Sequence, residues 1–163
     1  MAEWLKDAVF YEIYPQSFQD TNADGIGDFQ GIIDRLDYIK ELGCNAIWMN
    51  PCFESPFGDA GYDVSDYYTA APRYGTNGDL KRLFDEVHKR GMKVILDGVF
   101  NHCGSFNKWL DRELIYESAD GYEVGAFVSP KSPYRNYFLF HRTGENEWPG
   151  NGSYDGWWGH DTL

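Results

Sequence analysis

The sequence predicts an α/β protein with parallel strands, either part of a barrel or an open sheet. The first observation is an internal repeat: residues 42–48 and 90–96, 48 positions apart, both pass from a helix end through glycine into a short run. The second is that both runs are apolar, as in strands buried on both faces. The third is a polar cluster, Asp97, Asn101 and His102, after the later run. Because functional groups gather at the carboxyl ends of parallel strands, this cluster marks a candidate site.

The first half of the pattern contains a strand, a helix and a second strand. The first strand is expected over residues 8–14, which are rich in β-forming residues and stop at a proline. Glu12 in its middle is either a paired core carboxylate or a site group, and the sequence does not decide. A helix from about 30 to 42 follows, because apolar residues recur on one face and Gly43 can end it. Residues 45–50 then form a short buried strand.

The second helix completes the next unit. It starts near Thr76, whose hydroxyl can form a capping box with Asp79, and it stops at Gly91. The stretch 53–68 before it is polar and aromatic and is expected to be a loop. The third strand follows the helix directly and leads into the polar cluster.

The alternation of helix and strand fails after His102. The remaining residues predict a short helix near 107–114 and a tail rich in Gly, Trp, Asn and Asp, without another helix-then-strand unit. We therefore divide the chain into 1–104, with three βα units, and 105–163, an irregular or β-rich excursion after the third strand. Three strands cannot close a barrel, and the apolar helix faces need a complete sheet. We expect the chain to be part of a longer one, with the rest of the sheet or barrel as its partner.

The composition excludes several classes of function. Hydrophobic residues make up 42% of the 163 residues, which excludes a disordered chain. The formal charge of −12 disfavours nucleic acid and anionic membranes as partners, because phosphates would be repelled. No run reaches the ~20 apolar residues of a membrane span, and the N-terminus lacks a signal-peptide pattern. With three cysteines that show no metal-ligand spacing, we expect a cytoplasmic protein, unless a targeting segment has been removed.

An acidic loop after the first strand has the spacing of a calcium site. Oxygen ligands occupy its positions 1, 3, 5 and 9, and Gly25 at position 6 allows the sharp turn. Position 12 is Gly31 and not glutamate, so the loop is not an EF-hand. The expected ligands are the side chains of Asp20, Asn22, Asp24 and Asp28 and the backbone carbonyl of Ile26. Ca²⁺ is favoured over Mg²⁺ because a flexible all-oxygen loop suits the larger ion, and the alternative is a solvated acidic turn.

Four motifs in order carry a family resemblance. They are Val-Phe-Tyr-Glu-Ile-Tyr-Pro-Gln-Ser-Phe at 9–18, the acidic loop at 20–28, Gly-Tyr-Asp-Val-Ser-Asp-Tyr at 61–67, and Asp-Gly-Val-Phe-Asn-His at 97–102. Together they resemble the α-amylase family of glycoside hydrolases, and the opening closely resembles its oligo-1,6-glucosidase, trehalulose-synthase-like and neopullulanase-like members. A looser likeness runs to Trp157-Trp158 and the residues after them.

The resemblance implies the N-terminal portion of a TIM (β/α)8 barrel with an inserted domain B after strand three. It implies a hydrolase or transglycosylase that cleaves the α-glucosidic bonds of maltodextrin or starch with retention, through a carboxylate nucleophile and a carboxylic acid. Asp59, Tyr62 and His102 match positions that bind the sugar, and Asp97 and Asn101 match supporting positions. The catalytic carboxylates of the family follow strands four, five and seven, so we assign no catalytic residue here and expect the 163-residue chain alone to be inactive.

Other interpretations stay open. Aromatic residues make up 18% of the chain, which suits the C–H faces of sugars but also ordinary cores. His102 can be a core histidine, Tyr62 can serve packing alone, and Asp97 can be a buried structural carboxylate. The alternative function is a catalytically inactive carbohydrate-binding or calcium-binding scaffold protein on the same fold.

Overall fold

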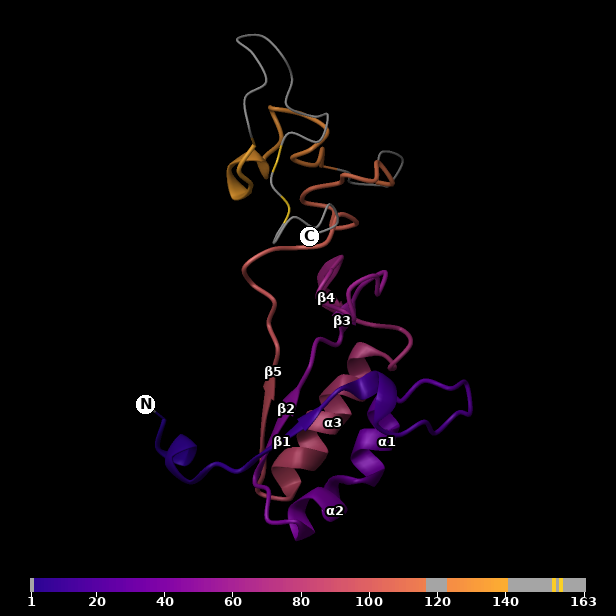
Figure 1. Ribbon diagram of the computed structural model, residues 1–163, viewed down its shortest axis with the longest axis vertical. Helices are drawn as coiled ribbons and strands as arrows, with labels where there is room; N and C mark the ends of the chain where they lie inside the picture. Colours follow the sequence, from indigo (N-terminus) through magenta and orange to yellow (C-terminus); the bar gives the residue numbers. More distant parts are fainter. Residues whose placement is uncertain (1, 117–122, 141–153, 155, 157–163) are drawn as a thin grey trace. The chain divides into compact units, whose positions relative to one another are not determined.

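The computed structural model describes residues 2–116, 123–140, 154 and 156 (Figure 1). The chain forms two compact units, one of Met1–Glu54 and Tyr67–Gly98 and the other of Ser55–Asp66 and Val99–Leu163. The bounds of these units differ from the division expected between residues 104 and 105. That division concerns the domains of the whole protein, and it stays a prediction.

The first unit is organised around a three-stranded parallel sheet. Its strands are β1 (Phe10–Ile13), β2 (Ala46–Met49) and β5 (Lys93–Leu96), in the spatial order β1-β2-β5. The predicted parallel α/β arrangement is therefore confirmed. In the register, Ile13 lies beside Met49, and Met49 beside Leu96. The three strands thus end at the same level, which brings the residues that follow them to one edge of the sheet.

Helices cover one face of this sheet (Figure 1). Helix α3 (Asn77–Lys89) packs against β5 and against α1 (Phe29–Asp34), and α1 continues to α2 (Leu36–Glu41). On the covered face, Ile13 and Met49 are no more than 1% exposed.

The other face of the sheet is open. Phe10, Trp48 and Ile95 are 37%, 39% and 37% exposed, and they alternate along the strands with the covered side chains. The apolar runs had predicted cover on both faces. Within the part of the chain that the structure describes, large apolar side chains on this face stay accessible to solvent.

The single helix expected from 30 to 42 is two helices. Arg35 between them has φ −106° and ψ 3°, and its backbone N–H donates to the carbonyl of Ile32. The break has a side-chain partner, because the Arg35 guanidinium donates to Gln19 Oε1 at 3.0 and 2.7 Å. The apolar face continues across the break, since Ile32, Leu36 and Ile39 are all fully buried.

Helix α3 begins with the predicted capping box. The backbone N–H of Asp79 donates to Thr76 Oγ1 at 3.1 Å, and the Asp79 carboxylate accepts the Thr76 backbone N–H at 2.9 Å. This reciprocal pair satisfies two backbone donors near the helix N-terminus. The helix ends at Lys89, two residues before Gly91.

The stretch 53–68, expected to be a loop, contributes to a small sheet. Its strands are β3 (Phe53–Glu54) and β4 (Asp66–Ala70). The rings of Phe53 and Tyr67 contact each other with centroids 5.8 Å apart. The β-forming run Tyr-Tyr-Thr at 67–69 was the available signal, and the surrounding polar residues obscured it.

The second unit consists mainly of turns. The helix expected near 107–114 does not form, and the prediction is wrong there. Asp111 and Leu114 have φ of 50° and 56°, which interrupts a right-handed helix. The Asn107 side chain also accepts the backbone N–H of Trp109 at 2.9 Å. One 3₁₀ turn, η3 (Arg135–Tyr137), is present among the described residues of this unit, and Trp157 and Trp158 lie outside them.

Candidate functional site

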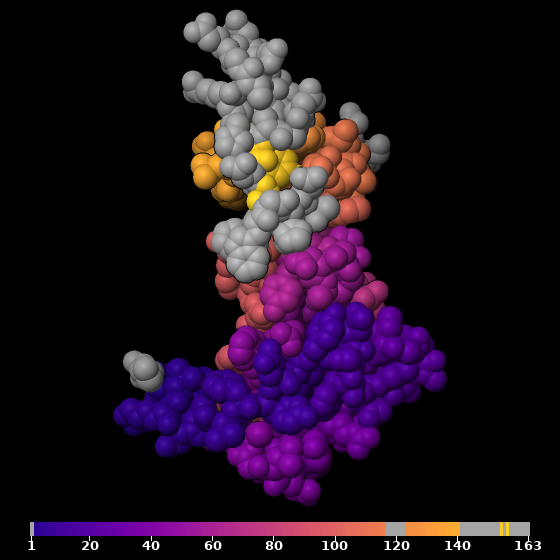
Figure 2. All heavy atoms as spheres, viewed as in Figure 1, coloured from indigo at the N-terminus to yellow at the C-terminus, as the bar shows by residue number. Residues whose placement is uncertain are grey.

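The acidic loop at 20–28 lies between η2 (Pro15–Ser17) and α1 and projects from the first unit (Figure 1, Figure 2). Asp20 organises its first half, because its two carboxylate oxygens accept the backbone N–H groups of Asn22, Ala23 and Gly25 at 3.0, 2.7 and 2.8 Å. These bonds, led by the one from Gly25, hold the pKa of the Asp20 carboxyl below its ordinary value. Gly25 has φ 88°, as the predicted sharp turn requires.

Asp28 at the end of the loop caps helix α1. Its Oδ1 accepts the Gly31 backbone N–H at 2.7 Å, which is an N-cap bond. Its Oδ2 accepts the backbone N–H and the hydroxyl of Thr21 at 2.9 and 2.7 Å. Asp28 therefore ties the start of the loop to the start of the helix, a role that the sequence analysis did not anticipate.

The acidic loop has no ion-pair partner among the basic side chains that the structure describes. None of the ion pairs found between described residues includes Asp20, Asp24 or Asp28. In the same part of the chain, no three His, Cys, Asp or Glu side chains converge on one point that could hold a metal ion. The loop thus has oxygen donors of the right kind for a hard cation, but its carboxylates are turned toward backbone N–H groups.

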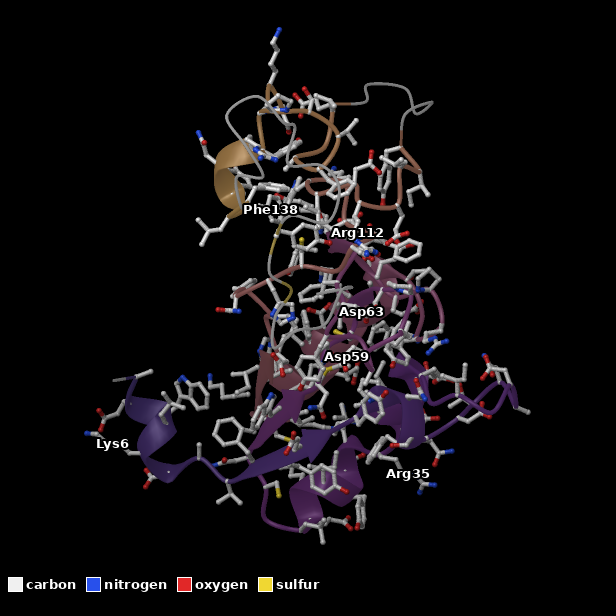
Figure 3. The ribbon with its side chains drawn as sticks, turned by 45° about the horizontal axis from the view of Figure 1, so that its top comes forward. Lys6, Arg35, Asp59, Asp63, Arg112 and Phe138 are labelled. Carbon is white, nitrogen blue, oxygen red and sulfur yellow. The ribbon has the colours of Figure 1, made fainter. Side chains whose placement is uncertain are left out.

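Two of the three predicted sugar ligands lie on a loop of the second unit. Asp59 is exposed and Tyr62 is half-buried. The Tyr62 backbone N–H donates to the Asp59 carbonyl at 2.8 Å, so a tight turn joins these residues. Figure 3 labels Asp59 beside Asp63, which follows Tyr62 on the same loop.

The structure brings the third residue, His102, to this loop. Its Nε2 lies 3.1 Å from the backbone carbonyl oxygen of Tyr62. Because a carbonyl can only accept, the contact is a hydrogen bond when Nε2 carries a proton. Residues 40 positions apart in the sequence are thus in contact, and the sugar-binding roles of Asp59, Tyr62 and His102 stay predictions. Asn101, the predicted supporting residue beside His102, is exposed.

Asp97, the other predicted supporting residue, belongs to the first unit. Its backbone N–H donates to the Met49 carbonyl at 2.8 Å, so it continues the pairing of β5 with β2. The strand alternation places it on the open face of the sheet, together with Glu12 and Asn50. Asn50 Nδ2 donates to Glu12 Oε1 at 3.2 Å, and Glu12 is exposed, so it is not a core carboxylate. Asn50 was not selected from the sequence, although a polar residue directly after an apolar strand was a usable signal.

Comparison with known proteins identifies the class and the family. Parallel strands that end in polar residues at one sheet edge are typical of α/β enzymes. The family model described as Alpha amylase, catalytic domain, matches residues 12–162. The chain therefore belongs to the alpha-amylase family, and its parallel strands and helices are the N-terminal part of a TIM-barrel fold.

Curated relatives share this region. The chain is 46% identical to an oligo-1,6-glucosidase from Bacillus sp. (strain F5) over 140 residues, which cover 86% of the chain and 25% of the relative. It is 44% identical to a trehalose-6-phosphate hydrolase from Bacillus subtilis (strain 168) over 143 residues, which cover 88% and 23%. The chain thus spans about a quarter of the length of the curated relatives it matches.

Solved structures agree with these relatives. The crystal structure of Bacillus licheniformis trehalose-6-phosphate hydrolase matches with a TM-score of 0.76 and 42% identity, over 87% of this chain and 23% of that one. The isomaltulose synthase from Protaminobacter rubrum matches with a TM-score of 0.76 and 43% identity, over 89% and 24%. Among the described residues of the present chain, no helix is both long and apolar enough to cross a membrane.

Proposed function

We propose that the protein carrying this chain is a retaining glycoside hydrolase or transglycosylase that acts on the α-glucosidic bonds of maltodextrin-type oligosaccharides. The observation that carries the proposal is the contact between His102 and the Tyr62 carbonyl in a chain of the alpha-amylase family. It joins the two segments on which the predicted sugar ligands lie. The similar proteins include a trehalose-6-phosphate hydrolase and an isomaltulose synthase, so both hydrolysis and transfer remain within the proposal.

Each residue has a role that its chemistry supports. The half-buried Tyr62 offers a ring face to the C–H groups of a glucose unit. Asp59 is exposed and accepts hydrogen bonds from sugar hydroxyls. His102 contacts the Tyr62 backbone through Nε2, and we assign its ring to the same sugar. The resemblance assigns supporting roles to Asp97 and Asn101, and the bond-breaking carboxylates are expected on later strands of the whole protein.

The experiment is a comparison of His102→Ala and Tyr62→Ala with the wild-type full-length protein on maltotriose and isomaltose. We expect each substitution to lower kcat/KM by roughly 10- to 100-fold, because each removes a hydrogen bond or a stacked ring from a desolvated site. His88→Ala, at an exposed position of α3, serves as the matched control and should leave kcat/KM unchanged. Unchanged kinetics in both site variants would refute the assigned roles.

A bound cation is a second part of the proposal. The side-chain oxygens of Asp20, Asn22, Asp24 and Asp28 and the carbonyl of Ile26 would hold Ca²⁺, with Mg²⁺ as the smaller alternative. The unpaired charge of the three carboxylates supports this assignment, since a cation would relieve their mutual repulsion. Binding requires the carboxylates to turn from their backbone partners toward one point.

The proposed location is the cytoplasm. Cys44, Cys52 and Cys103 are free thiols in the structure, which suits a reducing compartment.

A further inference from the structure

Asp63 is a buried carboxylate that the proposed sugar contacts do not use. Asp63 lies in the second unit and is only 2% exposed. A buried carboxylate is costly unless hydrogen bonds compensate for the lost hydration. The hydrogen-bond partners of Asp63 therefore indicate its structural role.

The carboxylate closes the loop that carries Asp59 and Tyr62. Asp63 Oδ1 accepts the hydroxyl of Ser55 at 2.6 Å, and Oδ2 accepts the backbone N–H of Gly58 at 2.8 Å. The Ser55 oxygen in turn accepts the backbone N–H of Phe57 at 2.8 Å. Ser55 and Gly58 are thus tied to the carboxylate of Asp63, and Asp59 and Tyr62 lie between Gly58 and Asp63.

The backbone around Asp63 meets the segment that carries His102. The Val64 carbonyl accepts the Gly104 backbone N–H at 2.9 Å. A Cβ atom on Gly104 would lie 2.5 Å from the carbonyl oxygen of Asp63, so only glycine permits this close approach. With the contact of His102 to the Tyr62 carbonyl, residues 62–64 form a continuous seam with residues 102–104.

We propose that Asp63 is a positioning residue for the sugar site, which sets Asp59 and Tyr62 against His102 by fixing the closed loop from inside. This inference rests on the proposed function, because positioning Asp59 and Tyr62 serves sugar binding only if these residues bind the sugar. Asp63 itself does not touch the substrate. It acts through its bonds to Ser55 and Gly58 and through the seam beside Gly104.

Asp63→Asn in the full-length protein tests the proposal. The amide has nearly the shape of the carboxylate, but it is neutral. Its oxygen can still accept the Gly58 N–H and its nitrogen must then donate to Ser55 Oγ, so both charge-assisted bonds are lost and the bond to Ser55 is reversed. We expect KM for maltotriose to rise on the order of 10-fold or more, with a smaller effect on kcat, because the misplaced residues bind the sugar ring. Ser55→Ala should give a partial loss, and Ser55→Thr, which keeps the hydroxyl, should restore binding.

Asp111→Asn is the matched control for burial. Asp111 is 1% exposed in the same unit and accepts the Ile115 backbone N–H at 3.0 Å, but it is not bonded to the loop ends at Ser55 or Gly58. This variant should unfold at lower denaturant, yet keep the wild-type KM. If Asp63→Asn and Asp111→Asn change KM equally, or if Asp63→Asn leaves KM unchanged while folded, the positioning role is refuted.

A spectroscopic measurement separates this inference from the proposed function. In full-length protein labelled with ¹⁵N-histidine, the His102 ring signal, assigned with His102→Gln, should shift in Asp63→Asn and not in Asp111→Asn. That shift would support positioning even in a protein without turnover, in which case the proposed function alone fails. A His102 signal unchanged by Asp63→Asn would overturn the inference even in an active enzyme.

Discussion

At the scale of single residues, two buried cysteines show how the surroundings of a side chain set its pKa. Burial raises the pKa of the Cys52 and Cys103 thiols to about 12, because a thiolate would lose its hydration there. Since the thiolate is the reactive form, both residues should be inert at neutral pH. Cys44 is more accessible than either of them.

We therefore predict that iodoacetamide at pH 8 modifies Cys44 in the native protein and leaves Cys52 and Cys103 unmodified. Peptide mapping by mass spectrometry would show all three labelled after denaturation. Rapid native labelling at Cys52 or Cys103 would contradict the burial of that thiol.

The sugar-site residues could be selected from the sequence only through their motifs. Asp97, Asn101 and His102 could be selected by their residue types and their place after a strand. The contact of His102 with the Tyr62 carbonyl joins residues 40 positions apart, and no local sequence pattern predicts it. The same holds for Asp63, whose partners Ser55 and Gly58 lie eight and five positions earlier across a turn. Buried polar bonds of this kind depend on how a loop closes, and no periodicity encodes that.

At the scale of elements, local rules were most reliable where a cap or an apolar stripe decides the structure. The capping box of α3 and the three parallel strands were predicted because their signals lie within a few residues. The break between α1 and α2 was missed because a distant side chain, Gln19, bonds Arg35. The sheet of β3 and β4 was missed because its pairing joins residues on both sides of a polar loop.

The capping box gives an element-scale prediction. Thr76→Ala should lower the free energy of unfolding by about 1 kcal/mol, the usual cost of losing an N-cap side chain. Thr76→Ser should retain most of it. Urea denaturation of the two variants checks this, and an Ala variant as stable as wild type would show that solvent replaces the cap.

The cap also carries a pH dependence. The Thr76 hydroxyl, with the Thr76 backbone N–H, holds the pKa of Asp79 below its ordinary value of 3.8. Because the pKa of Asp79 is lower in the folded state, the ionised carboxylate stabilises the fold, and this stabilisation is fully present above the pKa of the unfolded state. It is lost as the pH falls through the lower folded pKa, and Thr76→Ala should weaken this acid sensitivity.

The acidic loop gives a second prediction at this scale. If the loop at 20–28 binds Ca²⁺, EDTA should lower the Tm of the purified protein and added Ca²⁺ should restore it, because a ligand that binds the folded state stabilises it. Asp24→Asn should weaken this response, while Glu41→Gln, at an exposed position of α2, should not. A Tm that EDTA leaves unchanged would reduce the loop to an acidic turn.

At the scale of the whole molecule, the open face of the sheet carries the main prediction. In a closed barrel, helices cover one strand face and the other faces the barrel interior. Phe10, Trp48 and Ile95 on the open face would become interior residues once the remaining strands join. We infer that the rest of the barrel is the partner of this face.

This inference predicts the behaviour of the isolated 163-residue chain. It should bind the dye ANS more strongly than the full-length protein does, because its sheet face stays exposed. It should also show no turnover of maltotriose, since the proposed catalytic carboxylates belong to later strands. Fluorescence and a glucose-release assay on both proteins check this. Turnover by the pure chain would contradict the assignment of the catalytic groups.

The most direct test of the central claim is the stereochemistry of the first product released by the full-length protein. ¹H NMR during hydrolysis of maltotriose or isomaltose distinguishes the α-anomer from the β-anomer before mutarotation mixes them. The account predicts initial release of the α-anomer, as retention at an α-glucosidic bond requires. Release of the β-anomer, or absence of any cleavage or transfer of these sugars, would contradict it.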